Sequence, residues 1–116
     1  MSTVTPSAPT LHSFVLWAPD NEGVLAKRLS IRQQHLDNVN RLIAQKILRV
    51  GGGFMMPESV GAEAADRKFV GSCVIYEAAN IDVVRRIVEE DVYYKEGVWD
   101  KEKLVILPIA MATPFN

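Results

Sequence analysis

The segment with the clearest chemical potential is "SIRQQHLDNV", residues 30–39, because it places a histidine shortly after two arginines. Arg28, Arg32 and His35 are separated by four and three positions, so on a helix they lie along one side. The histidine is compatible with four roles: a spacer, a core residue, a metal ligand or a proton-transfer group. Two neighbouring cations disfavour a protonated imidazole, so we expect a compensating carboxylate nearby.

Asp91 is the best candidate for that carboxylate. It stands in "EEDVYYKEGVW", at the end of a second expected helix that packs beside the first. Glu89 and Glu90 fit the solvated surface of that helix better. A pair formed by Asp91 and His35 would orient the imidazole and supply a proton donor or acceptor near neutral pH. A neighbouring arginine would then stabilise an enolate, phenolate or carboxylate.

Structural explanations compete with each of these roles. From the residues alone, His35 is also explained as a helix histidine bonded to a neighbour, and Asp91 as a turn residue that accepts from backbone N–H groups. Arg28 is equally typical of a helix surface, whereas Arg32, which is closer to His35, is the stronger candidate for binding an anion. Ser72 stands at the start of a strand, where it could bond a ligand or simply occupy a sheet edge.

Aromatic residues and glycines give weaker signals. Tyr93, Tyr94 and Trp99 could line a cleft for an aromatic ligand, although aromatic residues beside a terminal strand usually serve packing. The glycines at 51–53 are followed by a strand pattern, without the Gly-Lys-Ser/Thr and helix of a phosphate-binding loop. They therefore indicate a close backbone approach or a bulge.

Composition bounds the class of protein. The chain has 116 residues, a formal net charge of −1, 48% hydrophobic and 23% charged residues, which is typical of one soluble globular domain with no nucleic-acid partner. Cys73 is the single cysteine and the chain has two histidines, so we expect no disulfide, metal or cofactor. No secretory signal or bilayer-spanning run is visible, so we expect a cytoplasmic protein without a membrane partner.

The spacing of apolar residues predicts the elements that position these side chains. Residues 1–10 predict a flexible arm, residues 11–110 the domain and residues 111–116 a tail. The long helix shows apolar spacings of three, four and seven, with a bend or interruption near Ser30. The expected elements are a strand at 12–18, a helix at 24–48, a strand at 49–56, a loop at 57–67, a strand at 68–78, a helix capped by Asn80 at 80–91, an aromatic turn-rich segment at 91–100 and a strand at 102–110.

This order, β-α-β-β-α-β, predicts a ferredoxin-like α+β sandwich, in which both helices cover one face of an antiparallel sheet. The segments "FVGSCVIYEA" and "KLVILPIA" are apolar at alternating positions of both phases. The uncovered face of the sheet is therefore expected to bury itself against a second copy, which predicts a homodimer.

Four segments in order, "RLSIRQQHL", "VGGGFM", "GSCVIYEA" and "VEEDVYYKEGVWDKEKLVILPI", resemble the YCII-related (YciI-like) domain family over about residues 11–110. The resemblance implies a dimeric α/β-barrel type of ferredoxin-like fold, with His35 and Asp91 as counterparts of a histidine–aspartate site. It also implies a relationship to a dehydrochlorinase of chlorinated hydroxyquinols and a fold similar to muconolactone isomerases. Val92 departs from the family pattern, which usually has proline after the aspartate.

The sequence and this resemblance together favour a small cofactor-independent lyase or isomerase acting on a small cyclic or aromatic oxygenated substrate. His35 would move the proton, Asp91 would orient it, and Arg32 with Arg28 would hold an anionic oxygen. The alternative is a dimeric binding or regulatory module that holds a small molecule without turning it over. A third interpretation is that the histidine–aspartate pair merely joins two helices.

Overall fold

The structure, a computed structural model, describes residues 9–115, so most of the predicted N-terminal arm lies outside the described residues. Its elements follow the predicted order. They are β1 (His12–Pro19), α1 (Leu25–Ser30), α2 (Arg32–Ala44), β2 (Leu48–Met55), η1 (Pro57–Ser59), η2 (Ala64–Asp66), β3 (Phe69–Ala78), α3 (Ile81–Glu90), α4 (Val92–Lys95) and β4 (Val105–Pro108).

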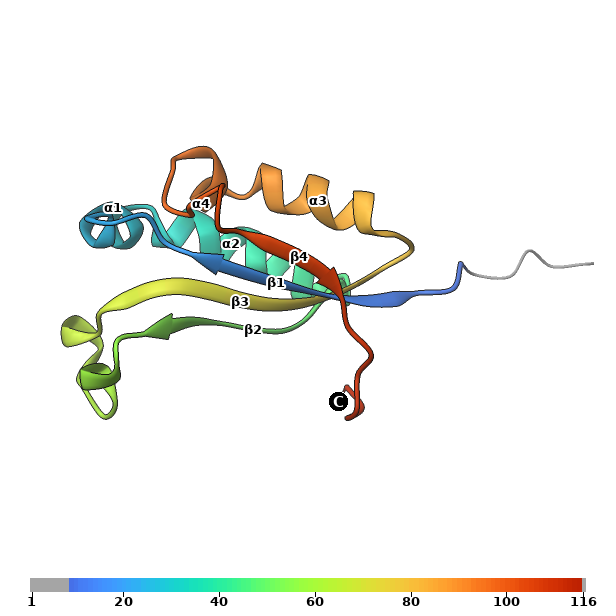
Figure 1. Ribbon diagram of the computed structural model, residues 1–116, viewed down its shortest axis with the longest axis horizontal. Helices are drawn as coiled ribbons and strands as arrows, with labels where there is room; N and C mark the ends of the chain where they lie inside the picture. Colours follow the sequence, from blue (N-terminus) through green and yellow to red (C-terminus); the bar gives the residue numbers. More distant parts are fainter. Residues whose placement is uncertain (1–8, 116) are drawn as a thin grey trace, which may run out of the picture.

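The four strands form one antiparallel sheet in the order β2-β3-β1-β4. The β1–β3 pairing runs from His12 opposite Ala78 to Pro19 opposite Gly71, so the two central strands are paired along their length. The helices lie on one side of this sheet (Figure 1). The predicted ferredoxin-like α+β fold is therefore confirmed.

The long predicted helix is interrupted beside Ser30, as its sequence indicates. The Ser30 hydroxyl donates to the Lys27 carbonyl at 2.7 Å, a local bond that competes with regular helical geometry. Ile31 then separates α1 from α2. As a result Arg28 belongs to one helix and Arg32 with His35 to the next, which corrects the expectation that one continuous helix face carries all three.

Two element boundaries differ from the prediction for local reasons. The helix ends at Ala44 rather than residue 48, because Lys46 takes a left-handed conformation with φ 59° that reverses the chain toward β2. The last strand begins only at Val105, because the N–H groups of Lys103 and Leu104 both donate to the Asp100 carbonyl and close a turn.

The core lies between the sheet and the helices. Alternate β1 side chains, Phe14, Leu16 and Ala18, are buried there, together with Val84 and Val88 of α3. The predicted cap of α3 is present, because the Asn80 side chain accepts from the Val83 N–H at 3.1 Å. Such a cap stabilises a helix by about 1 kcal/mol, and this helix leads directly to Asp91.

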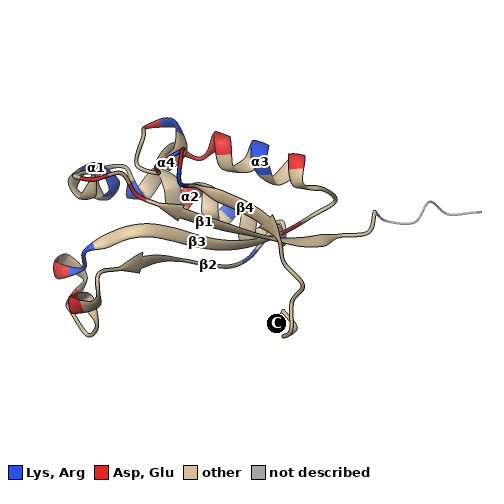
Figure 2. Ribbon diagram, viewed as in Figure 1, with Lys and Arg blue, Asp and Glu red and all other residues tan. Residues whose placement is uncertain are grey.

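The opposite face of the sheet is apolar and uncovered. Trp17 stacks on Phe54 with ring centres 4.2 Å apart, and both Trp17 and Leu107 remain about half exposed. Charged residues gather on the helices and loops, while the strands carry few (Figure 2). Within residues 9–115, no helix combines the length and apolar character needed to cross a membrane.

Candidate active site

His35 and Asp91 meet between α2 and the start of α4. The His35 Nδ1 lies 2.9 Å from Asp91 Oδ1, and both side chains are largely buried. Since an ionised carboxylate only accepts hydrogen bonds, this contact places the imidazole proton on Nδ1 and leaves a lone pair on Nε2 in the neutral ring. The arrangement fits an oriented general base.

The local backbone holds Asp91 firmly. Asp91 ends α3 and caps α4, and its Oδ1 also accepts from the Tyr93 N–H at 2.9 Å. Its own N–H donates to the Val88 carbonyl at 3.1 Å. These bonds fix the carboxylate although Val92 stands where the resemblance leads one to expect proline, because a helix cap constrains the same backbone that proline would restrict.

Aromatic rings hold the imidazole from its sides. The Tyr93 ring stacks on His35 with centres 3.9 Å apart, and Trp99 meets the imidazole edge-on at 6.1 Å. Among residues 9–115, Nε2 has no hydrogen-bond partner, and no buried side-chain nitrogen or oxygen lacks one. Nε2 is therefore the accessible end of the ring.

Arg28 is a buried cation with several partners. Its Nη1 donates to both carboxylate oxygens of Asp20 at 2.8 and 2.9 Å, and its Nη2 donates to the Ser72 hydroxyl at 2.9 Å. The guanidinium carbon lies 4.7 Å from the Tyr93 ring centre. Burial raises the pKa of the Asp20 carboxyl, and the charge of Arg28 opposes that shift.

Tyr93 lies between the His35–Asp91 pair and the Arg28 side chain. Its ring contacts both His35 and Arg28, and its hydroxyl donates to the Arg28 carbonyl at 3.3 Å. Burial raises the pKa of the Tyr93 phenol, while the charges of Arg28 and Arg32 act in the opposite direction. Tyr93 is therefore a neutral wall of the site rather than a proton acceptor at neutral pH.

A pocket of about 320 Å³ opens between α2 and strands β2 and β3, within the size range of small-ligand sites. Its polar and aromatic lining comprises Arg28, Arg32, His35, Arg49, Phe69, Ser72 and Tyr93. Its aliphatic lining comes from α2, through Leu36, Val39 and Ile43, and from the strands, through Leu48 and Val74. Arg32 is exposed and has no ion-pair partner among residues 9–115.

The glycines of β2 form the floor of this pocket. A Cβ on Gly53 would lie 2.7 Å from the Phe69 ring and 3.0 Å from Arg28 Nη2, and a Cβ on Gly51 would lie 3.4 Å from Leu48. Gly52 points to the opposite face of the sheet, where a Cβ would meet nothing within 4 Å. Close approach explains Gly53, whereas a Cβ on Gly51 would fit in ordinary contact with Leu48 and Val74.

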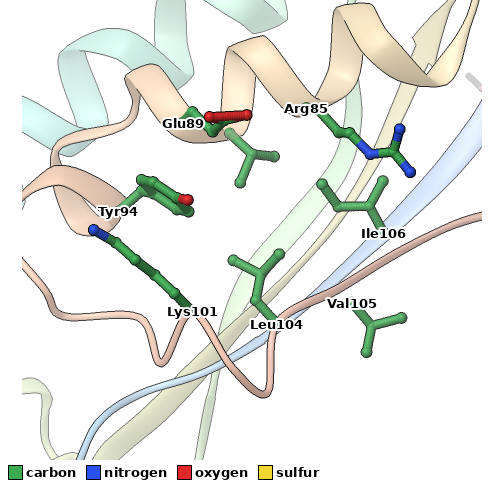
Figure 3. A pocket seen from close by; sticks show the side chains of 8 residues that line it. Arg85, Glu89, Tyr94, Lys101, Leu104, Val105 and Ile106 are labelled. Carbon is green, nitrogen blue, oxygen red and sulfur yellow. The ribbon is translucent and has the colours of Figure 1, made fainter.

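The structure separates two of the predicted site residues from the pocket. Trp99 is fully buried and lies behind Ser72, to which its Nε1 donates at 3.1 Å. Tyr94 faces a different pocket of about 400 Å³ between α3 and β4, where the Lys101 amine lies 4.5 Å from its ring centre (Figure 3). The short helix α4 separates Tyr94 from Tyr93, because consecutive residues on a helix point in different directions.

Asp20 escaped the sequence analysis, because nothing in its spacing indicated a partner for Arg28. Tyr93 was named there as a possible cleft residue together with Tyr94 and Trp99, without a signal that it alone of the three lines this pocket. Among residues 9–115 there is no cluster of three or more histidine, cysteine, aspartate or glutamate side chains that could hold a metal ion.

The fold and the site together describe a ferredoxin-like α+β domain that holds a buried histidine–carboxylate pair beside a small pocket. Residues 13–107 match the YCII-related domain, and the chain belongs to this family. The resemblance noted from the sequence is thereby confirmed.

Relatives of known sequence support membership of this family. The chain is 31% identical over 87 residues to protein YciI of Escherichia coli O6:H1, covering 75% of this chain and 87% of that protein. It is 29% identical over 110 residues to aspartate kinase FUB3 of Fusarium oxysporum f. sp. lycopersici, covering 94% of this chain but 20% of that protein. The chain therefore spans about a fifth of the length of this second relative.

A solved enzyme structure shares the fold. It is the 5-chloro-2-hydroxyhydroquinone dehydrochlorinase TftG from Burkholderia phenoliruptrix AC1100, in complex with 2,5-dihydroxybenzoquinone. The TM-score is 0.69 with 27% sequence identity, over 82% of this chain and 90% of that chain. A structural neighbour of this chain is therefore a lyase that binds a small cyclic ligand.

Proposed function

We propose that this protein is a cofactor-independent lyase or isomerase that uses His35 as its proton-transfer group on a small cyclic oxygenated substrate. The observation that carries the proposal is the 2.9 Å contact between His35 Nδ1 and Asp91 Oδ1, with the other ring nitrogen accessible. The position of His35 in the lining of a ligand-sized pocket supports it. The fold shared with a dehydrochlorinase points to the same class of reaction.

In the proposed mechanism, His35 Nε2 takes a proton from an oxygen or carbon of the ring. The electron pair that remains on the substrate becomes an enolate or phenolate, which Arg32 and Arg28 stabilise. Asp91 balances the imidazolium charge. Either a leaving group then departs with its electron pair, or the proton returns to a different atom of the ring.

We also propose that the protein acts as a homodimer. The uncovered sheet face displays Trp17, Val105 and Leu107, each at least 40% exposed. An apolar surface of this kind marks an interface more often than a solvated face. A second copy packed against it would leave the His35 pocket, on the helix side of the sheet, open to substrate.

The test is turnover of 5-chloro-2-hydroxyhydroquinone, measured anaerobically as chloride release, by the wild type and by His35→Gln. Loss of a proton-transfer side chain costs about 10²- to 10⁴-fold in rate, so we expect a decrease of that size. The matched control is His12→Gln, the same substitution on an exposed residue at the start of β1, which is expected to retain wild-type rates.

A lactone and deuterium exchange extend the test to isomerase chemistry. Muconolactone is offered in deuterated water, and incorporation of deuterium into the ring reports proton transfer without a leaving group. Binding of these rings without chloride release or exchange would contradict the enzyme proposal and support the binding module. Equal rates for His35→Gln and the wild type would remove His35 from the mechanism.

A further inference from the structure

Ser72 is a buried residue at the edge of the pocket. It lies on β3 with 3% of its surface exposed, and it lines the cavity. Its cross-strand partners are Ala18 on β1 and Gly53 on β2. Since Gly53 has no side chain, Arg28 Nη2 and the Phe69 ring approach this strand closely beside Ser72.

Two donors occupy the lone pairs of the Ser72 hydroxyl. Arg28 Nη2 donates to it at 2.9 Å and Trp99 Nε1 donates to it at 3.1 Å. Guanidinium and indole N–H groups cannot accept hydrogen bonds, so neither can take the hydroxyl proton. Among residues 9–115, the Ser72 hydroxyl makes no other hydrogen bond.

The hydroxyl proton is therefore a buried donor that no described residue accepts. The positive charge of Arg28 polarises the O–H bond and strengthens it as a donor. Ser59, the other buried serine among residues 9–115, accepts from one N–H, that of Lys68, has no hydrogen bond with Arg28, and does not line this pocket.

We propose that Ser72 is a specificity-determining residue whose hydroxyl donates to a ring oxygen of the ligand that has no proton of its own, a carbonyl or phenolate oxygen. Arg28 and Trp99 hold Ser72 in this orientation. The inference rests on the proposed function only in placing a cyclic ligand in the pocket beside His35. It adds that the site selects the keto or ionised form of the ring.

The test is equilibrium binding of 2,5-dihydroxybenzoquinone to the wild type and to Ser72→Ala. A hydrogen bond to a charged or polarised oxygen contributes about 10- to 100-fold in affinity, so we expect weakening of that size. The infrared stretch of the bound ring carbonyl gives a second readout. It lies at lower frequency when the oxygen accepts a hydrogen bond, and Ser72→Ala should return it toward the value of the free ligand.

Ser59→Ala is the matched control, because it also removes a buried hydroxyl that accepts a hydrogen bond. It is expected to keep wild-type affinity and carbonyl frequency. If Ser72→Ala does not fold, Ser72→Cys provides a side chain of similar size with a weaker donor, and an intermediate shift in both readouts is expected.

Unchanged carbonyl frequency in a folded Ser72 variant would overturn this proposal, as would failure of the wild type to bind the quinone. Neither readout requires turnover, so the outcome is separate from that of the His35 experiment. A variant that lowers affinity without moving the carbonyl band would show that Ser72 only maintains the shape of the pocket.

Discussion

At the scale of single residues, the charge of Asp91 and its hydrogen bonds have separable effects. One oxygen accepts from both His35 and the Tyr93 N–H, so the same carboxylate orients the imidazole and caps α4. An asparagine retains an acceptor for the backbone but removes the charge. It also carries an amide NH₂ group that, turned toward His35, would favour the wrong tautomer.

Asp91→Asn is therefore expected to lower kcat by about 10²- to 10⁴-fold, while the free energy of unfolding changes by less than about 1 kcal/mol. Asp91→Ala removes the cap as well and should destabilise the fold by a further ~1 kcal/mol. Turnover assays and urea unfolding of both variants check this. Similar kcat for Asp91→Asn and the wild type would show that the pair is structural.

At the scale of elements, β2 determines the space available to a ligand. Its three glycines line the cavity without side chains, beside Leu48 and Arg49 of the same strand, and the bulges at Leu48/Val50 and Phe54/Met55 bracket them. Glycine weakens a strand by roughly 0.5–1 kcal/mol relative to alanine. The glycines therefore lower the stability of this strand and leave space for a ligand beside it.

Gly51→Ala should weaken binding of 2,5-dihydroxybenzoquinone by about tenfold, because one added carbon in a fitted pocket has an effect of that order. The new Cβ fits the protein itself, with its nearest neighbour at 3.4 Å. Gly52→Ala is the matched control on the opposite face. Both variants should be more stable than the wild type by up to about 1 kcal/mol, and equal affinities would contradict this account of the floor.

At the scale of the whole molecule, the distribution of apolar surface predicts association. Trp17→Glu places a charge on the uncovered sheet face and should shift the sedimentation coefficient from that of a dimer toward that of a monomer. Val60→Glu adds the same charge at a position 84% exposed in the loop before η2, and it should leave the dimer intact. A monomeric wild type at micromolar concentration would contradict the proposed homodimer.

Alkaline pH tests the burial of the tyrosines. Burial raises the pKa values of Tyr76 and Tyr93 in the folded protein, whereas unfolded tyrosines lose their protons near about pH 10. Above that pH the unfolded state binds fewer protons than the folded state, so the free energy of unfolding falls as pH rises. Urea unfolding at increasing pH, together with ultraviolet titration of tyrosinate, measures both effects. A free energy of unfolding that stays constant above that pH would contradict this prediction.

Much of the architecture follows from local sequence alone. The period of the apolar residues predicted the order of strands and helices, Asn80 predicted the start of α3, and Ser30 predicted the interruption of the long helix. These features depend on hydrogen bonds and packing within a few residues, which the sequence displays directly. The family was recognisable for the same reason, because its motifs are short and ordered.

The tertiary structure alone decided which side chains share the pocket. Arg28 pairs with Asp20 through the fold, and Tyr93 faces the site while Tyr94 does not. Trp99 supports Ser72 from behind instead of contacting a ligand. Such relationships join residues from different elements or separate neighbours by one helical step, so no spacing rule predicts them. The sequence by itself determined the elements and nominated His35 and Asp91, and the packing of those elements determined their neighbours.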